Sequence, residues 1–356
     1  MSIRPIRVAL VAALLAALLA AMPFGASEAA EALRIRTWVR VPDDILQQFR
    51  RETGVDVRLL ATMEEPSKAH ARGRPGVDLF QLSPYDPAGP QQIVGAYRPL
   101  DLSRIRTERF IPSLWEATRR RMTFDGKVYG VPAYWETHGL VVNVKAAPKL
   151  ADYPGLCDPS LAGRTALSDD SVMLAAFAFS GGMDPFSAYG DLQAYEAIMD
   201  RVGAGLAPCK AIVKRFTVLH EIPDALRSGA IVAATVGQDV GLRLAAENAD
   251  FRFIVPKFTS PGWIHAYAIP RGGRMDEAAY RWINFTMRPE IAGRIANANL
   301  LPASGGFDAF LDSRLKRVFA ESFPDGVIDG VRWFPVRPDT IHHIDLRLLD
   351  RLDEIR

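Results

Sequence analysis

Extended runs alternate with a helical segment near the start of the chain, and this alternation restricts the fold class more than any other feature of the sequence. Residues 33–38 (LRIRTW) and 55–60 (VDVRLL) have the pattern of short strands, and residues 41–54 (VPDDILQQFRRETG) have the pattern of an amphipathic helix. A third strand is expected over residues 77–82. This alternation predicts an open α/β sheet that is mainly parallel and binds ligands beyond the carboxyl ends of its strands.

Polar and aromatic residues follow two of these strands. Trp38 ends the first strand, and the turn after the third strand contains Ser83 and Tyr85. Because carboxyl ends of parallel strands meet at one edge of a sheet, we expect these side chains to contribute to a binding site. A buried aromatic at Trp38 and plain turn chemistry at Ser83 are the alternatives.

Two later segments are expected to connect two halves of the protein. Residues 129–135 (YGVPAYW) and 139–144 (GLVVNV) are extended runs separated by residues 136–138, which we interpret as a crossing from a first lobe into a second. Residues 262–270 (GWIHAYAIP) read as the crossing back. Trp263 and His265 lie two positions apart on this run, so they share one face of the strand.

The first 32 residues have the pattern of a secretory signal peptide. Arg4 and Arg7 precede a run of Ala, Leu and Val over residues 8–21, and small residues follow. The apolar run is shorter than the roughly 20 residues that cross a bilayer as a helix. We therefore expect residues 1–32 to be removed on export, and the remaining chain to be periplasmic.

The charges of the chain are nearly balanced, with 43 Lys and Arg against 41 Asp and Glu and a formal net charge of +2. Nucleic-acid binding requires a concentrated basic face, so the balance argues against it. The sequence contains no G-x-S-x-G, H-E-x-x-H or P-loop motif, so neither an enzyme nor a cofactor is expected. Without a Cys/His cluster, a metal site is not expected either.

The chain has two cysteines, Cys157 and Cys209. In an oxidising compartment they are expected to form a disulfide that closes a loop of about 50 residues. Two free buried thiols are the alternative.

The order of these elements resembles that of the periplasmic solute-binding proteins of ABC importers, and within them the spermidine/putrescine-binding group. The segments that carry the resemblance span nearly the whole chain after residue 32: RTWVRVPDDILQQFRRETGVDV, VDLFQLSPY, GVPAYWETHGLVVN, ALSDD, ALRSGAIVAATVG, VPKFTSPGWIHAYAIP and WINFTMRPEIAGRIA. The resemblance implies a two-lobed periplasmic-binding-protein fold of type II, with each lobe a mixed, mainly parallel sheet flanked by helices. It also implies a small-molecule ligand between the lobes and delivery to an ABC permease in the inner membrane.

The two crossings set the expected boundaries of the lobes. Lobe 1 should comprise residues 33–135 and 264–308, and lobe 2 should comprise residues 136–263 and 309–356. A monomer is expected.

Five residues match ligand contacts of the spermidine/putrescine-binding group: Trp38, Ser83, Tyr85, Asp170 and Trp263. These residue types suit an amine, because aromatic faces attract a cation and a carboxylate fixes its head. Asp169 and Asp170 also precede a helix, so one of them is expected to cap it.

Three positions depart from the group. His265 replaces the aspartate that follows the hinge tryptophan, Met173 replaces a glutamate, and Gly237 replaces a cleft tryptophan. A long polyamine needs an anion at each end, because an unpaired buried ammonium is costly. The departures therefore favour a small amine or amino-acid-like ligand with one cationic end and a polar or anionic end.

Three residues near these positions could supply the missing polar contacts. Glu136 stands where the group usually has a small residue, and Gln238 and Asp239 follow Gly237. The alternative ligand is an organic anion or phosphonate bound by His265, Arg40 and backbone amides. A receptor-linked sensor is the alternative role. The predicted ligand contacts are Trp38, Ser83, Tyr85, Glu136, Asp170, Gln238, Asp239, Trp263 and His265.

Overall fold

The structure is a computed structural model that describes residues 32–60, 76–82, 90–210, 212–217, 221–298 and 301–354. The predicted signal peptide, apart from its last residue, lies outside the described residues, and so do Ser83 and Tyr85.

The strands are β1 (Leu33–Arg36), β2 (Val57–Leu60), β3 (Leu79–Leu82), β4 (Thr123–Phe124), β5 (Lys127–Val128), β6 (Val131–Asn143), β7 (Thr165–Ser168), β8 (Arg215–Thr217), β9 (Ala233–Gly237), β10 (Phe251–Ile254), β11 (Pro261–Ala268), β12 (Leu301–Pro302) and β13 (Arg332–Trp333). The α-helices are α2 (Asp43–Thr53), α4 (Pro90–Ala96), α5 (Pro112–Met122), α6 (Ser171–Ser180), α7 (Leu192–Lys210), α8 (Ile222–Arg227), α9 (Gln238–Glu247), α10 (Asp276–Thr286), α11 (Pro289–Ala296), α12 (Ser313–Ser322) and α13 (Asp339–Glu354).

The first strand–helix–strand unit forms as its local signals predict. Asp43 and Asp44 occupy the first turn of α2, where their charge complements the helix dipole. Gly54 ends the helix with φ +73°, in the left-handed region that glycine adopts without a side-chain clash. Ile45 and Phe49 are buried on one face of α2. β1 then pairs in parallel with both β2 and β3.

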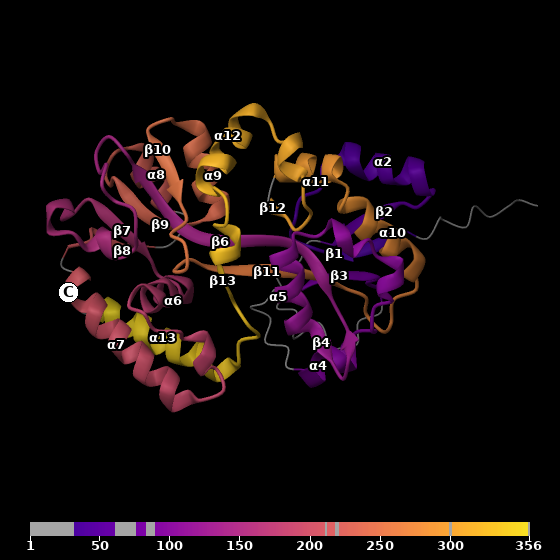
Figure 1. Cartoon of the computed structure of the whole chain (residues 1–356), viewed down its shortest axis with the longest axis horizontal. Coiled ribbons are helices and arrows are strands. Elements are labelled where there is room, and N and C mark those ends of the chain that lie inside the picture. The colour runs from indigo at the N-terminus through magenta and orange to yellow at the C-terminus, as the bar shows by residue number, and fades with distance from the viewer. Residues whose placement is uncertain are drawn as a thin grey trace, which may run out of the picture. The chain divides into compact units, whose positions relative to one another are not determined.

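One long strand, β6, replaces the two extended runs that the sequence suggested. Residues 136–138 do not interrupt the strand, because Thr137 pairs with Gly262 of β11 and His138 pairs with Gly237 of β9. The first part of β6 is antiparallel to β11, and its last part is antiparallel to β9 and β10. β6 and β11 run side by side through the middle of Figure 1.

The remaining strands extend the sheet on either side of this antiparallel pair, in the order β2-β1-β3-β11-β6-β9-β7-β8. At one end β1 is parallel to β2 and β3, and at the other end β7 is parallel to β8 and β9. The sheet is therefore mixed, with parallel outer strands and antiparallel central strands. Carboxyl ends of parallel strands occur in both halves, and these ends are where polar side chains can gather.

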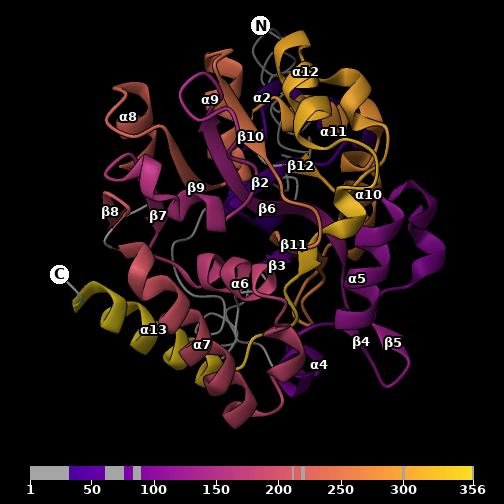
Figure 2. The same cartoon turned by 60° about the vertical axis from the view of Figure 1, so that its left-hand side comes forward.

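Separate hydrophobic clusters support the two halves. Phe49 of α2 packs edge-on against Trp282 of α10 within the cluster that contains β1 and β3. A second cluster lies between α6, α7 and α13, and Figures 1 and 2 both show α13 running beside α7. Cys157 and Cys209 form a disulfide, with Cα atoms 4.9 Å apart, which joins the segment before β7 to the end of α7. The predicted bridge is therefore present.

Within the described ranges, no helix has both the length and the apolar character that crossing a membrane requires.

Candidate functional site

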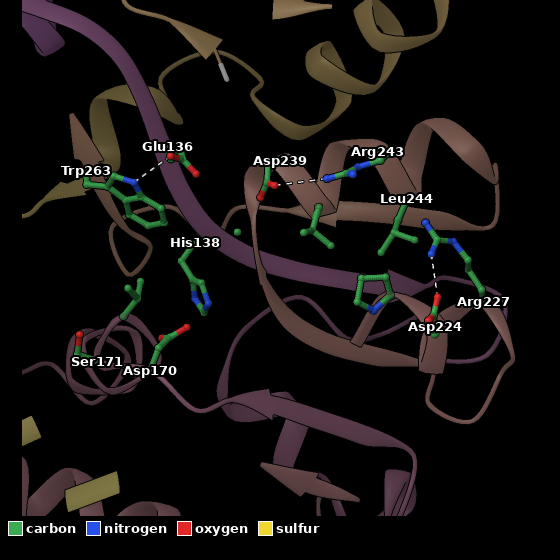
Figure 3. Close-up of a pocket in the computed structure, with 14 residues that line it drawn as sticks. Glu136, His138, Asp170, Ser171, Asp224, Arg227, Asp239, Arg243, Leu244 and Trp263 are labelled. Atoms are coloured by element: carbon green, nitrogen blue, oxygen red, sulfur yellow. Dashed lines mark hydrogen bonds and ion pairs between the residues drawn. The ribbon is translucent and has the colours of Figure 1, made fainter. Parts of the chain in front are cut away.

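A cavity of about 700 Å³ opens between the middle of β6 and the helices that follow β7 and β9. We call it the first cavity. It is lined by Glu136, His138, Asp170, Ser171, Val172, Pro223, Asp224, Arg227, Gly237, Asp239, Val240, Arg243, Leu244 and Trp263. Figure 3 shows Glu136 and His138 projecting from the same strand, with Trp263 beside them and Asp170 on the helix opposite.

The carboxylate of Glu136, on β6, is held in place by two side chains of the neighbouring strand β11. The indole Nε1 of Trp263 donates to Oε1 of Glu136 at 3.1 Å, and Nε2 of His265 lies 3.0 Å from the same oxygen. The Glu136 side chain is 13% exposed and His265 is 3% exposed. In the described part of the chain, both hydrogen bonds to this carboxylate end on Oε1, so Oε2 remains available at the cavity wall.

His265 lies behind Glu136 and does not line the first cavity. It does not line the adjoining second cavity either, which is described below. Its ring packs edge-on against Trp38, with centroids 4.8 Å apart. The predicted contact residue is thus placed to orient Glu136 and Trp38. Trp38 itself remains 43% exposed.

Asp170 has both of the roles that the sequence left open. Its Oδ1 accepts a hydrogen bond of 2.8 Å from the backbone N–H of Met173, which caps α6. The same side chain lines the first cavity. Because α6 begins here, the positive end of the helix dipole also stabilises the carboxylate.

Asp239 lies in the first turn of α9 and faces the cavity beside Glu136. Although the Asp239 side chain is 42% exposed, the cavity wall partly desolvates its carboxyl group, and this effect, followed by the negative charge of Glu136, raises the pKa of Asp239 above its ordinary value. Arg243, one turn later on α9, lies 3.4 Å from Asp239, and both side chains are well exposed. An exposed pair of this kind contributes only about 0.3–0.5 kcal/mol, so a ligand can displace it.

Gly237 and Gln238 have different places. Gly237 lines the first cavity, and its lack of a side chain leaves that space open. Gln238 is buried and its Nε2 donates to the carbonyl of Trp135 at 2.6 Å, so it ties α9 to β6. It lines neither cavity.

His138 lines the cavity although it is not among the ligand contacts predicted from the sequence. It is 1% exposed, and its ring stacks on Tyr153 with centroids 6.1 Å apart. Burial lowers the pKa of His138, and the nearby charge of Asp170 opposes this effect only in part. The imidazole is therefore neutral near pH 7.

Helix α9 contributes lining residues that the sequence analysis missed. Val240 and Leu244 are spaced four residues apart and line the first cavity, as Asp239 and Arg243 do one position earlier. This i,i+4 spacing after the glycine at the end of β9 was the available signal. The apolar pair suits a hydrocarbon part of a ligand.

A second cavity, of about 650 Å³, adjoins the first. It is lined by Trp38, Val39, Glu136, Asp239, Leu242, Arg243, Ala246, Ala296, Asn297, Ala298, Leu301, Asp312, Arg314 and Leu315. Glu136, Asp239 and Arg243 form the wall that both cavities share. Trp38 therefore lines a cavity that also contains Glu136 in its wall.

The first cavity carries an excess of negative charge. Four carboxylates line it, from Glu136, Asp170, Asp224 and Asp239, against the two guanidinium groups of Arg227 and Arg243. Both arginines are already paired with acids, Arg227 with Asp224 and Glu247 and Arg243 with Asp239. Glu136 and Asp170 form no ion pair with an arginine or a lysine in the described part of the chain. The arrangement can therefore stabilise a cation.

Known proteins share this architecture. The spermidine/putrescine-binding periplasmic protein of Escherichia coli K12 is 24% identical over 274 residues, which cover 72% of this chain and 72% of that protein. The crystal structure of the spermidine/putrescine transporter substrate-binding protein PotD from Streptococcus pneumoniae matches with a TM-score of 0.75 at 19% identity, over 91% of this chain and 99% of that chain. The Atu4243-GABA receptor matches with a TM-score of 0.62 at 16% identity, over 91% of this chain and 96% of that chain.

These structural matches establish the two-lobed periplasmic-binding-protein fold of type II, with β6 and β11 as the crossing strands. Residues 44–309 match the family model described as bacterial extracellular solute-binding protein. This match covers most of the chain, and the chain belongs to the family of bacterial extracellular solute-binding proteins.

Proposed function

We propose that this protein is the substrate-binding component of an ABC importer and that it captures a small amine or amino-acid-like solute between its lobes. Residues 33–135 and 264–308 form lobe 1, and residues 136–263 and 309–356 form lobe 2. The support for these boundaries is that β6 and β11 pair with the strands of both halves. Bending of these two strands closes the cleft.

The observation that carries the proposal is the fixed carboxylate of Glu136 in a cavity with excess negative charge. Trp263 and His265 orient Glu136 from the neighbouring strand, and Trp263 also supplies an aromatic face. A charge-assisted hydrogen bond contributes about 1.5–3 kcal/mol, which exceeds what a neutral contact offers. An ammonium group at Glu136 supplies both the positive charge and the N–H donors that this carboxylate lacks.

Glu136 also compensates for the charges that the chain lacks relative to the spermidine/putrescine-binding group. Met173 and His265 stand at positions where that group has carboxylates. In this structure Met173 is completely buried and His265 lies behind Glu136. The anionic contact has in effect moved from position 265 of β11 to Glu136 of β6, which pairs in register with Trp263. A smaller ligand than spermidine fits this redistribution.

An organic anion is a weaker candidate. Arg227 and Arg243 are paired with acids of the protein, and the buried ring of His265 is turned to Glu136. An anion entering the first cavity meets more carboxylates than free guanidinium groups. Its desolvation would not be repaid.

Capture and release depend on contacts with both lobes. All residues that line the first cavity belong to lobe 2, and Trp38 of lobe 1 lines only the adjoining second cavity. Closure of the cleft therefore has to bring lobe 1 onto a ligand that Glu136 holds. Only a ligand that contacts both lobes shifts the open–closed equilibrium, because the shift equals its difference in affinity for the two states. The closed form then docks on an inner-membrane permease. The protein acts as a monomer in the periplasm, after residues 1–32 are removed, and leaves its ligand chemically unchanged.

The test is calorimetry on residues 33–356 with a panel of primary amines, amino acids, polyamines and organic acids. We expect amines to bind and simple dicarboxylates not to bind. A ligand at about 100 times its Kd should add roughly 2.7 kcal/mol to the free energy of unfolding, which a thermal shift detects. Selective binding of organic acids would refute the proposal.

A further inference from the structure

His138 lines the first cavity and has a ring nitrogen that is unsatisfied within the described part of the chain. The side chain is 1% exposed, and the unsatisfied nitrogen is its Nδ1. An unpaired buried polar atom costs about 1–3 kcal/mol, so a partner is expected when the protein is complete with its ligand.

A chain of hydrogen bonds determines which kind of partner Nδ1 needs. The backbone N–H of Ser168 donates to Oγ1 of Thr235, and the hydroxyl of Thr235 donates to Oγ of Ser168 at 3.0 Å. Because Oγ of Ser168 already accepts from Thr235, its own proton is free to be donated to Nε2 of His138, at 3.2 Å. This arrangement favours Nε2 as the acceptor of the neutral ring and Nδ1–H as its donor. His138 offers a hydrogen-bond donor to the ligand.

The position of His138 on β6 fixes the distance from the ammonium site. Glu136 and His138 are two positions apart on β6 and project from the same face of the strand (Figure 3). Two residues of a strand at this spacing have Cα atoms about 7 Å apart. Val172, Val240 and Leu244 line the same cavity and suit a short hydrocarbon chain. Asp170, whose charge acts on the His138 ring, lies at this end of the cavity.

We infer that the ligand, if it is an amine as proposed above, carries a neutral oxygen such as a hydroxyl four or five bonds from its ammonium nitrogen, and that His138 selects for this oxygen. The hydroxyl oxygen accepts from Nδ1–H of His138, and the hydroxyl proton is donated to Asp170. One group thus satisfies both side chains.

Other end groups match less well. In a diamine, the second ammonium group has only N–H donors. It cannot accept the hydrogen bond that Nδ1–H of His138 offers, because two donors then face each other. A carboxylate accepts from His138 but meets the negative charge of Asp170. The inference therefore distinguishes an amino alcohol from a diamine and from an amino acid of the same length.

Calorimetry of residues 33–356 with four compounds tests this order: 4-amino-1-butanol, butylamine, putrescine and 4-aminobutyrate. We expect the amino alcohol to bind at least about tenfold more tightly than each of the other three, because only its hydroxyl satisfies the buried donor without placing a second negative charge beside Asp170. Tightest binding of putrescine or of 4-aminobutyrate would overturn the inference while leaving amine binding intact. If no member of the panel binds, the proposed function fails with it.

Two variants separate selection by His138 from a structural role. His138→Phe keeps the ring that stacks on Tyr153 and removes both nitrogens. Ser168→Ala keeps the imidazole and removes the hydroxyl that fixes its proton on Nδ1. In both variants the preference for 4-amino-1-butanol over butylamine should fall to about threefold or less. A preference that survives both changes would refute the assignment.

The protonation of the ring has a spectroscopic signature. In ¹⁵N-labelled protein the nitrogen shifts of His138, assigned through their loss in His138→Phe, should be those of the Nδ1–H tautomer. Finding the Nε2–H tautomer, in which Nδ1 accepts, would contradict the inference and favour a second ammonium at this position.

Discussion

The carboxylate of Glu136 and the imidazole of His265 meet across the two crossing strands, with Oε1 of the glutamate 3.0 Å from Nε2 of the histidine. Glu136 stands on β6 and His265 stands on β11, where Trp263 pairs with Glu136 in register. The buried histidine therefore fixes the orientation of a carboxylate that faces the cavity. Under the proposed function, this contact connects the residue that binds the ammonium group with the two strands whose bending would close the cleft.

Replacing Glu136 with glutamine tests whether this carboxylate binds the ammonium group. Glu136→Gln removes the charge and keeps the shape, and we expect amine affinity to fall by about 10- to 100-fold, which calorimetry measures. Asp224→Asn is the matched control, because Asp224 lines the same cavity but is exposed and paired with Arg227. The control should change affinity by less than about threefold. Equal losses in both variants would show that only the summed charge of the cavity matters.

The two glycines of the β9–α9 segment allow a test of the cavity itself. Gly237 has φ −70°, and a Cβ there meets only Oδ1 of Asp239 at 3.2 Å. Gly237→Trp should therefore fold normally, with the free energy of unfolding changed by less than about 1 kcal/mol, yet lose ligand binding because the indole occupies the cavity. Ligand binding that survives the Gly237→Trp change would place the site elsewhere.

Gly241 is the contrasting position one turn later. A Cβ at Gly241 lies only 2.1 Å from the ring of Phe253. Gly241→Ala should lower the free energy of unfolding by about 1–3 kcal/mol in urea denaturation, since the ring has to move. Its ligand affinity, measured below the unfolding transition, should stay close to that of the unchanged protein.

Local signals were sufficient to predict the outer parts of the fold. α2 begins and ends where its acidic first turn and Gly54 indicate, because these signals act within a few residues. The break expected at residues 136–138 was wrong, because pairing with strands distant in the sequence, and not a local signal, determines the structure there. These polar residues interrupt the apolar pattern, but β11 and β9 satisfy their backbone groups, and the hydroxyl of Thr137 donates to the carbonyl of Pro261.

The candidate site was only partly predictable, because it depends on the register between distant strands. Asp170 and Trp263 could be placed in it, since each follows or lies on a recognisable strand. The relation of His265 to Glu136 depends on the pairing of β11 with β6, more than 120 residues apart in sequence. The lining by Val240 and Leu244 depends in turn on how α9 packs over β6 and β9.

The disulfide is expected to affect stability without affecting the ligand. Cys157 and Cys209 are 52 residues apart, and a bridge of this span stabilises the folded state by about 4 kcal/mol through the entropy of the unfolded chain. The double variant Cys157→Ala/Cys209→Ala should lose about that much in urea denaturation. Neither cysteine lines either cavity, so calorimetry should show amine affinity within about threefold. A loss of affinity larger than this would mean that the bridge also positions α6.

A buried acid on the C-terminal helix gives the protein a specific dependence on pH. Asp345 is 2% exposed, its Oδ1 accepts a hydrogen bond of 2.5 Å from the hydroxyl of Tyr195, and Arg337 lies 3.7 Å away. Burial raises the pKa of Asp345 to about 6, although both partners act to lower it. Between about pH 4 and pH 6 the folded protein therefore binds more protons at this site than the unfolded chain does. The free energy of unfolding falls as the pH rises through this window. Above pH 6 the folded protein bears the full cost of ionising the buried Asp345.

Asp345→Asn should remove this dependence, because asparagine keeps the shape and cannot ionise. A shift of about two pKa units corresponds to about 3 kcal/mol, so the difference in unfolding free energy between the variant and the unchanged protein should move by that order in favour of the variant from pH 4 to pH 7. Urea denaturation at intervals of half a pH unit measures it, and the other titrating groups cancel in the difference. Tyr195→Phe removes the hydrogen bond that lowers the pKa of Asp345. The free energy of unfolding of this variant should therefore fall over a higher pH range than that of the unchanged protein. A difference that stays constant from pH 4 to pH 7 would mean that Asp345 ionises with equal ease in the folded and unfolded protein.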